Sequence, residues 1–393
     1  MICIKTEYFN LNRILLFAIG LWPYQRSKFV RLYTILCFGI LVSFVILQLT
    51  AFATVKCTFD LIIKVLCVTI FFTITVIKYN MFWINTYRMK NLLEQLQYIF
   101  NELKDENEIA IFMKYGNNAK RCTAIITSFT ICSIFIATLI PVWPQIFDIV
   151  LHKNESQPHP TIQLVPQYFN QEKYYYLILL HTNVVICIGA TTLAATGAML
   201  LGCVICGCGL FQVASYRIEQ TMTIKMLKNV HLKNQTIIYK EIIYAIEIHH
   251  KAIKFTEFFM STIKDSFLFI IIIAVISLSL NIFGIFRDAA HGNKAGFLLH
   301  VLGLCVLLVY MFITNYAGQE ITNHNNYVYS TVYNSKWYIA PLHAQKLILF
   351  MLQRGNKAFH LNIGGLIVAS LECFTTLLKT SMSYFTVMNS MRE

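Results

Sequence analysis

Residues 174–216 read YYYLILLHTNVVICIGATTLAATGAMLLGCVICGCGLFQVASY and contain no Lys, Arg, Asp or Glu. This charge-free run of 43 residues, between Lys173 and Arg217, is about twice as long as a membrane span requires. The hydrocarbon core of a bilayer is ~30 Å thick, and an α-helix crosses it with ~20 residues because each residue rises ~1.5 Å. The run therefore predicts one helix that crosses the membrane and continues well beyond it.

The composition of the whole chain agrees with a membrane protein. Of the 393 residues, 57% are hydrophobic and 13% are charged, whereas soluble domains carry roughly 25% charged residues. Apolar runs recur along the entire length, which favours a polytopic protein over a soluble domain with one anchor. In a membrane protein, a net charge of +13 is explained by basic residues in the cytoplasmic loops. We therefore expect no nucleic-acid partner.

Seven spans and an all-α fold are expected from the apolar runs. The spans cover 32–55, 65–84, 122–147, 174–200 with its extension, 266–286, 295–319 and 362–391. Segments on one side of the spans carry 23 Lys and Arg, and those on the other side carry 7. Basic residues collect in cytoplasmic loops, so the amino terminus is predicted inside and the carboxyl terminus outside. Asn154, in an outer loop, matches the acceptor pattern for N-glycosylation.

Three segments on the predicted cytoplasmic side have helical periodicity. Apolar residues recur every three to four positions in 88–108 and 237–264, with charges between them, and 329–352 contains Trp337, Tyr338, Leu347 and Phe350, which are enough for another amphipathic helix. The second segment runs directly into the fifth span. We expect these segments to pack, with the extension of the fourth span, into a cytosolic helical anchor; the alternative is that they lie on the membrane surface. Lys78, inside the second span, is expected to snorkel to the cytoplasmic interface.

Motifs in the second half of the chain carry a family resemblance. They are CGLFQ (208–212), YRIE (216–219), HKA (250–252) with Phe255, GQE (318–320), YNSKWY (333–338), RGNK (354–357), GG (364–365) and the ending FTTLLKTSMSYFTV (374–387). Through these motifs the chain from about residue 190 onward resembles the insect odorant receptor family. The first 190 residues match that family in span count, orientation and loop length.

The resemblance implies a tetrameric cation channel opened by a small volatile odorant at the plasma membrane of olfactory sensory neurons. Most members pair with a common co-receptor, which has a long insertion between helices four and five. The short connection 219–236 therefore resembles a ligand-tuned subunit. The expected regions are a cytoplasmic segment 1–31, helices one to four with the odorant pocket in 32–217, helices five and six with the anchor in 218–361, and the pore-lining helix in 362–393.

The last helix contains the candidate pore residues. Ser383, Val387 and Met391 recur every four residues and form one helical stripe. Four copies around an axis would stack into rings, and an apolar ring can close a pore by dewetting. By resemblance, Val387 and Met391 lie at the gate; ordinary packing or exposure to lipid is the competing interpretation. Glu372 and Lys379 share a face, either as a vestibule that favours cations or as a structural ion pair.

The odorant pocket is expected, from the resemblance, among the outer halves of helices two, three, four and six. A volatile ligand needs a mainly apolar cavity with one or two polar groups. The candidates at helical spacing are Val68, Phe71, Phe72, Thr75, Ile136, Leu139, Ile140, Trp143, Tyr176, Leu180, Val184, His300 and Leu304. Tyr176 or His300 would supply a hydrogen bond, and plain interhelical packing is the alternative for each residue.

Other function classes lack their sequence features. A G-protein-coupled receptor would need an outer amino terminus, and the chain has no Asn-Pro pair and no Asp-Arg-Tyr triplet. The ending typical of gustatory receptors is absent, and a transporter should show repeated halves. No catalytic constellation is present, and Cys203, Cys206 and Cys208 have no adjacent His or carboxylate and suit helix packing. We therefore expect no enzyme activity, metal or cofactor.

Overall fold

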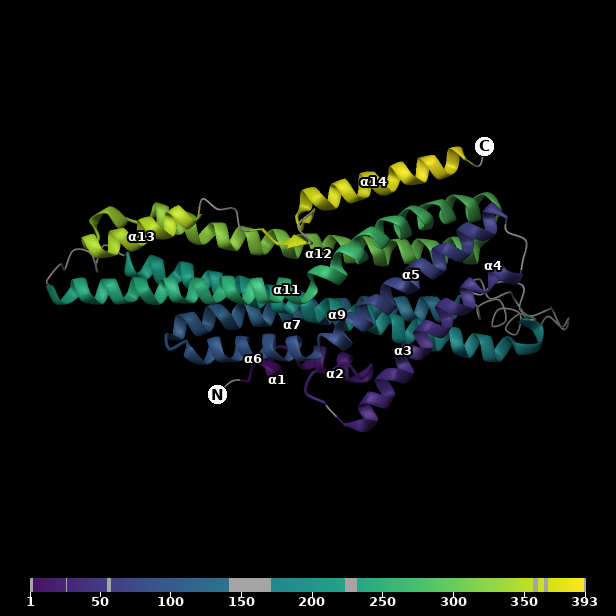
Figure 1. Cartoon of the computed structure of the whole chain (residues 1–393), viewed down its shortest axis with the longest axis horizontal. Coiled ribbons are helices and arrows are strands. Elements are labelled where there is room, and N and C mark those ends of the chain that lie inside the picture. The colour runs from purple at the N-terminus through teal and green to yellow at the C-terminus, as the bar shows by residue number, and fades with distance from the viewer. Residues whose placement is uncertain are drawn as a thin grey trace.

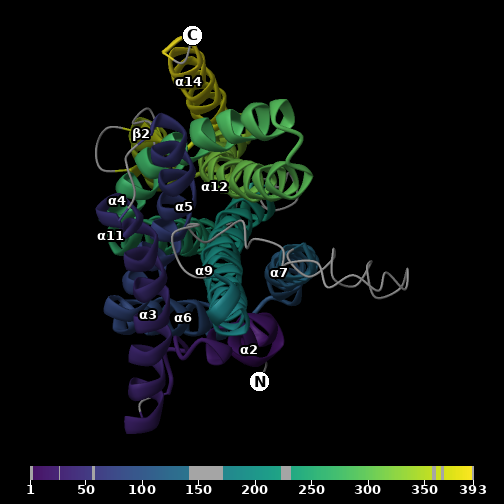
Figure 2. The same cartoon turned by 90° about the vertical axis from the view of Figure 1, so that its right-hand side faces the viewer.

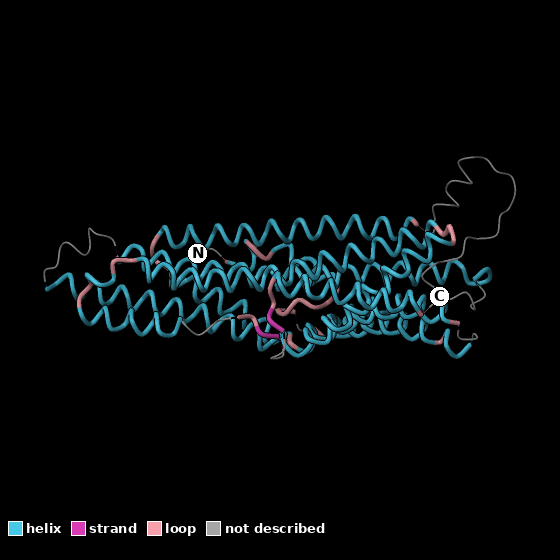
Figure 3. Tube along the Cα trace, turned by 90° about the horizontal axis from the view of Figure 1, so that it is seen from above, coloured by secondary structure: helices cyan, strands magenta, loops and turns pink. Residues whose placement is uncertain are grey.

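The computed structural model describes residues 3–25, 27–54, 58–140, 171–222, 232–355, 360–363 and 367–391. Long helices run along a common axis, and a short hairpin of two β-strands, β1 and β2, lies near the middle of the molecule (Figures 1 and 3). The elements are α1 (Ile4–Glu7), α2 (Asn10–Ala18), α3 (Lys28–Leu49), α4 (Ala51–Thr54), α5 (Phe59–Ile84), α6 (Thr86–Glu102), α7 (Glu106–Leu139), α9 (Gln171–Thr221), α11 (Leu232–Ala290), α12 (Lys294–Asn334), η1 (Trp337–Ile339), α13 (Leu342–Gly355), β1 (Asn362–Ile363), β2 (Ile367–Val368) and α14 (Leu371–Ser390).

α9 confirms the long helix predicted from the charge-free run. It has 51 residues and is therefore ~77 Å long, more than twice the thickness of a bilayer core. Its backbone departs from helical geometry at Tyr174, close to its start. Seen end-on, α9 lies in the middle of the bundle, and it packs along α7, α11 and α12 (Figure 2).

α11 and α12 are also much longer than a membrane span. α11 joins the predicted segment 237–264 to the fifth span in one helix of 59 residues, as expected. α12 has 41 residues and continues past 319 to Asn334. The prediction of one helix over 329–352 is therefore wrong: the chain breaks after Asn334, and α13 begins only at Leu342. Ser335 is extended directly after α12, and Pro341 disfavours the helical region for Ala340, which is extended as well, so that no helix continues from α12 into α13.

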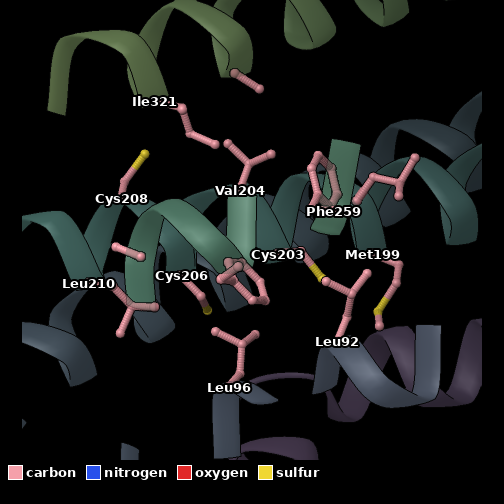
Figure 4. Packing of buried hydrophobic residues seen from close by; sticks show 14 of the residues in the cluster. Leu92, Leu96, Met199, Cys203, Val204, Cys206, Cys208, Leu210, Phe259 and Ile321 are labelled. Atoms are coloured by element: carbon pink, nitrogen blue, oxygen red, sulfur yellow. The ribbon is translucent and has the colours of Figure 1, made fainter. Parts of the chain in front are cut away.

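The amphipathic segments share one buried core with α9. Leu92 and Leu96 of α6 face the side of α9 that carries Cys203 and Cys206 (Figure 4). Further buried members of this core are Leu210, Ile238, Ile242, Val328 and Ile348. This shared core confirms that the segments pack into a helical bundle. It argues against the alternative, in which each would lie separately on a membrane surface. Cys203, Cys206 and Cys208 of α9 are buried in apolar surroundings, as small packing residues should be.

The amino-terminal segment is part of this bundle and is not a plain tail. α1 packs against α6, and α2 packs against α7 and α9. Two glycines admit its aromatic rings: a Cβ at Gly116 would lie 2.8 Å from the ring of Tyr8, and one at Gly202 would lie 2.7 Å from Phe9. Neither ring could occupy its position beside a larger residue, so the glycines fix where the segment docks.

Six of the described helices, namely α3, α5, α7, α9, α11 and α12, contain a segment long and apolar enough to cross a membrane. The expected seventh span corresponds to α14, which has 20 residues and is not among these six. Its many Ser and Thr residues, with Glu372 and Lys379, lower its hydropathy. The region 362–391 is also not one helix, because β1 and β2 precede α14. The orientation of the termini stays a prediction.

Candidate ligand cavity and pore helix

A cavity of about 500 Å³ lies among α5, α7, α9, α11 and α12. Most of its walls are aliphatic and aromatic side chains, with polar groups gathered near the start of α12. This volume lies within the range of small-molecule pockets, roughly 300–1,000 Å³. The cavity can therefore hold a largely apolar molecule and expel water from its surface.

Five of the predicted ligand residues line this cavity: Val68, Phe71, Phe72, Thr75 and His300. The described candidates that do not line it are Ile136, Leu139, Ile140, Tyr176, Leu180, Val184 and Leu304. Tyr176 and Leu180 are 71% and 62% exposed and lie nearer the start of α9 than its cavity-lining residues do. Trp143 and Asn154 lie outside the described residues.

Small residues on α9 form part of the cavity wall, although the sequence-based list of ligand residues did not include them. Gly189, Ala190, Ala194 and Gly197 recur at helical spacing and line the cavity. Carbon atoms of Phe72 and Tyr310 lie 3.5 and 3.6 Å from where Cβ atoms would stand at Gly189 and Gly197. A stripe of small residues inside an apolar helix is a signal for close approach by neighbours, and here that approach brings aromatic rings to the cavity.

Polar side chains gather at one end of the cavity, near the start of α12. This polar end comprises Lys64, Cys67, Asn281, Arg287, Asp288 and His300. His300 Nδ1 lies 3.3 Å from Asn281 Oδ1 and 3.5 Å from Cys67 Sγ. Its Nε2 lies 3.7 Å from Asp288 Oδ2. The His300 ring is therefore held by groups from α5 and α11 rather than free to rotate toward any ligand.

Lys78 does not snorkel, contrary to the sequence-based expectation. Its side chain is 0% exposed, and its Nζ has no hydrogen-bond partner within the described structure. The Nζ lies 4.1 Å from the centre of the Tyr310 ring and 5.6 Å from that of Phe267. Both rings line the cavity. A cation over an aromatic face gains roughly 2 kcal/mol when desolvated, so Lys78 is held by rings rather than by a carboxylate.

The two faces of α14 have different surroundings. One face packs on α11 and α12: Ser279 Oγ donates to the Ser381 carbonyl at 3.0 Å, and Phe385 stacks on Phe286 with 5.1 Å between ring centres. The candidate pore residues Ser383, Val387 and Met391 lie on the other, exposed face. Glu372 and Lys379 are exposed and form no ion pair among the described residues. The single chain thus leaves the predicted pore stripe uncovered.

Apolar helices of membrane-spanning length around an internal apolar cavity define a polytopic α-helical membrane protein that can hold a small molecule. A family model described as 7tm Odorant receptor matches residues 58–382. The chain therefore belongs to the odorant receptor family, as its motifs predicted. No curated protein matches it in sequence.

Solved structures of the insect olfactory receptor OR5 from Machilis hrabei have a similar fold. The complex with eugenol has a TM-score of 0.77 at 15% identity, and the alignment covers 99% of this chain and 98% of that receptor. The structure described without eugenol has a TM-score of 0.78 at 15% identity, with coverages of 98% and 97%. The likeness extends over the whole chain, including the first 190 residues that carried few motifs.

Proposed function

We propose that this odorant receptor is the ligand-tuned subunit of an odorant-gated, non-selective cation channel. The apolar cavity of about 500 Å³ is the observation that carries the proposal, because a small volatile ligand needs such a site. The similar Machilis hrabei receptor was solved in complex with eugenol, which supports a small odorant as the ligand here. Val68, Phe71, Phe72, Thr75 and His300 would contact it.

The channel itself would form around α14. Four subunits, in a tetramer with the co-receptor, would bring the exposed faces of their last helices together, so that Ser383, Val387 and Met391 surround the ion path. The exposure of that face in the single chain supports this assembly. Glu372 would then favour cations at the vestibule. The subunit would lie in the plasma membrane of olfactory sensory neurons, with Asn154 outside and glycosylated.

Gating would follow from the helices that the cavity and α14 share. α11 and α12 wall the cavity and also pack against α14. An odorant that binds more tightly to the packing with α14 moved outward shifts the population toward that open state. A ligand with equal affinity for both states would bind without opening the channel.

Recording currents from cells that express the chain with and without the co-receptor, against an odorant panel, tests this proposal. Phe129 lines the cavity from α7, whereas Phe135 on the same helix is 64% exposed and does not line it. Phe129→Ala should raise the half-maximal odorant concentration about tenfold, because a loss of ~1.4 kcal/mol of apolar contact weakens binding by that factor. Phe135→Ala should leave it unchanged. Equal effects of the two variants, or no current with any odorant, would contradict the proposal.

A further inference from the structure

The polar end of the cavity contains a buried ion pair. Arg287 and Asp288 are 8% and 4% exposed, and both line the cavity. The Arg287 Nε and Nη2 atoms donate to Asp288 Oδ1 at 3.0 and 2.8 Å. Buried charges of this kind lower stability unless they are fully paired. The pair fixes one cationic and one anionic group in the wall of the cavity.

Three glycines make room for these polar groups. A Cβ at Gly296 would lie 2.0 Å from Asp288 Oδ2, and one at Gly284 would lie 2.6 Å from the His300 ring. A Cβ at Gly303 would lie 2.9 Å from Asn281 Oδ1. Real Cβ contacts do not approach so closely, and interiors pack near crystal density. The arrangement of the polar end therefore depends on glycine at three separate positions of α11 and α12.

Lys64 gives the polar end an excess positive charge. It lines the cavity from α5 and interacts electrostatically with Arg287 and Asp288. Among the residues that the structure describes, Lys64 forms no ion pair, and the only carboxylate of the polar end already accepts two hydrogen bonds from Arg287. Lys64 and Arg287 thus bring two basic side chains to the polar end, which contains one carboxylate. Lys64 can therefore accept an added anion at the cavity wall, and a carboxylate fits a lysine as a charge-assisted acceptor.

The remainder of the cavity is long and narrow. On α12 its lining extends from Gly296 to Gly318, which at ~1.5 Å per residue is ~33 Å. A volume of about 500 Å³ over that length describes a slit rather than a round chamber. Apolar residues such as Phe71, Leu193 and Ile313 line it away from the polar end. A slit of this shape suits an unbranched alkyl chain.

We propose that the cavity binds an unbranched fatty acid, with its carboxylate on Lys64 at the polar end and its alkyl chain along the slit. This inference names the ligand class of the site in the proposed function and rests on that function only for the consequence of binding. A fatty acid can reach the site from solution or from the bilayer, and both sources present the same carboxylate and chain.

Direct binding to the purified full-length chain tests the inference without any current. Saturation binding is measured in phosphatidylcholine nanodiscs with hexanoic, decanoic and hexadecanoic acid, and with decanol as the uncharged match of decanoic acid. Affinity should increase with chain length, because each buried methylene adds to binding. Lys64→Met should weaken decanoic acid about tenfold to a hundredfold, the range for a lost hydrogen bond to a charged group, and should leave decanol unchanged.

Two matched variants separate charge recognition from misfolding. Lys64→Arg keeps the charge and should retain the preference for the acid over the alcohol. Lys294→Met removes an exposed lysine at the start of α12 that does not line the cavity, and it should change neither affinity. An acid-to-alcohol ratio that is unchanged in Lys64→Met would overturn the inference, whatever the odorant currents show.

Mass spectrometry of lipid extracts distinguishes the two sources. Fatty acid that copurifies with the parent chain and is lost from Lys64→Met would support binding from the bilayer. An extract without fatty acid, combined with binding of added acid, would support binding from solution. If no fatty acid copurifies and no added acid binds, the inference is wrong. The proposed odorant channel would be unaffected, because odorant currents test it separately.

Discussion

At the residue scale, His249 is the clearest source of pH-dependent stability outside the membrane-spanning segments. It is 4% exposed on α11, its Nε2 lies 3.2 Å from Asn325 Oδ1, and its ring forms T-shaped contacts with Phe211 and Tyr329. Burial lowers the pKa of His249 to about 4, although the hydrogen bond with Asn325 opposes the change. The folded chain therefore holds this imidazole neutral and ties α9, α11 and α12 together.

The sign of the pH effect follows from that lowered pKa. The unfolded chain binds a proton at His249 near pH 6.5 and the folded chain only near pH 4, so stability is complete above 6.5 and falls as the pH falls toward 4. The loss is at most about 3 kcal/mol, at 1.36 kcal/mol per pKa unit. His249→Gln should flatten this part of the profile in thermal unfolding between pH 7 and 4.5. Identical profiles of variant and parent would contradict the assignment.

Periodicity predicted cavity-lining residues of one helix, α5, but not those of α7. Val68, Phe71, Phe72 and Thr75 form one face of a helix, and that face meets the cavity. The burial of Lys78 could not be predicted, because it depends on rings that α11 and α12 bring from far along the chain. Apart from His300, the members of the polar end were missed for the same reason, because they come from helices that are distant in sequence.

At the element scale, an ion pair joins α7, α9 and α11. Both oxygens of Glu108 accept hydrogen bonds from the Arg217 guanidinium, one from Nε and one from Nη2 at 2.8 Å. Arg217 Nη1 also donates to the Tyr244 carbonyl at 3.1 Å. Glu108 is 5% exposed. The pair therefore fixes the end of α9 against its two neighbours with little solvent screening.

Removing one partner of this pair should lower the free energy of unfolding substantially. Glu108→Ala leaves the Arg217 cation without its carboxylate, and breaking a buried pair in this way lowers stability by about 3–5 kcal/mol. Glu94→Ala is the control: Glu94 pairs with Lys90 at 3.6 Å on the exposed face of α6, where such a pair contributes about 0.3–0.5 kcal/mol. Thermal unfolding in one detergent measures both variants. A Glu108→Ala loss no larger than that of Glu94→Ala would refute the structural role of the pair.

Elements were predicted most accurately where the sequence carries a long uninterrupted signal. The charge-free run gave α9, and continuous apolar periodicity into the fifth span gave α11. The break between α12 and α13 was missed because aromatic residues after 333 continue the apolar pattern, although Ser335 is extended and Pro341 disfavours the helical region for Ala340. α1 and α2 were missed because helices this short depend on tertiary packing more than on their own propensity.

At the scale of the whole molecule, one chain leaves its last helix half covered. The buried face of α14 meets α11 and α12, whereas Val387 and Met391 are 55% and 72% exposed. A surface that is exposed in one subunit can face lipid, protein or water after assembly. The exposure of the stripe is a property of the single chain, and its place in a pore stays a prediction. In the proposed channel, a reagent that reacts only where water is present can identify the environment of the stripe.

A charged thiol reagent distinguishes these environments. Val387→Cys places a thiol on the exposed stripe, and Met388→Cys places one on the neighbouring position, which packs near Leu280 and Phe283 of the same chain. A cationic methanethiosulfonate reagent needs water to reach a thiol, because a charge enters hydrocarbon only at high cost. In a pore it would add a fixed positive charge beside permeating cations, whose repulsion is strong in a narrow, low-dielectric passage.

The expected result is therefore a loss of about half or more of the odorant current in the Val387→Cys channel, since even a few kcal/mol of repulsion blocks cations. The parent chain, with its native cysteines, and Met388→Cys should keep their currents under the same treatment. A lipid-facing Val387 would leave the Val387→Cys current unchanged, because the reagent would not reach it. That outcome would remove this stripe from the ion path and require a different face of α14 to line the pore.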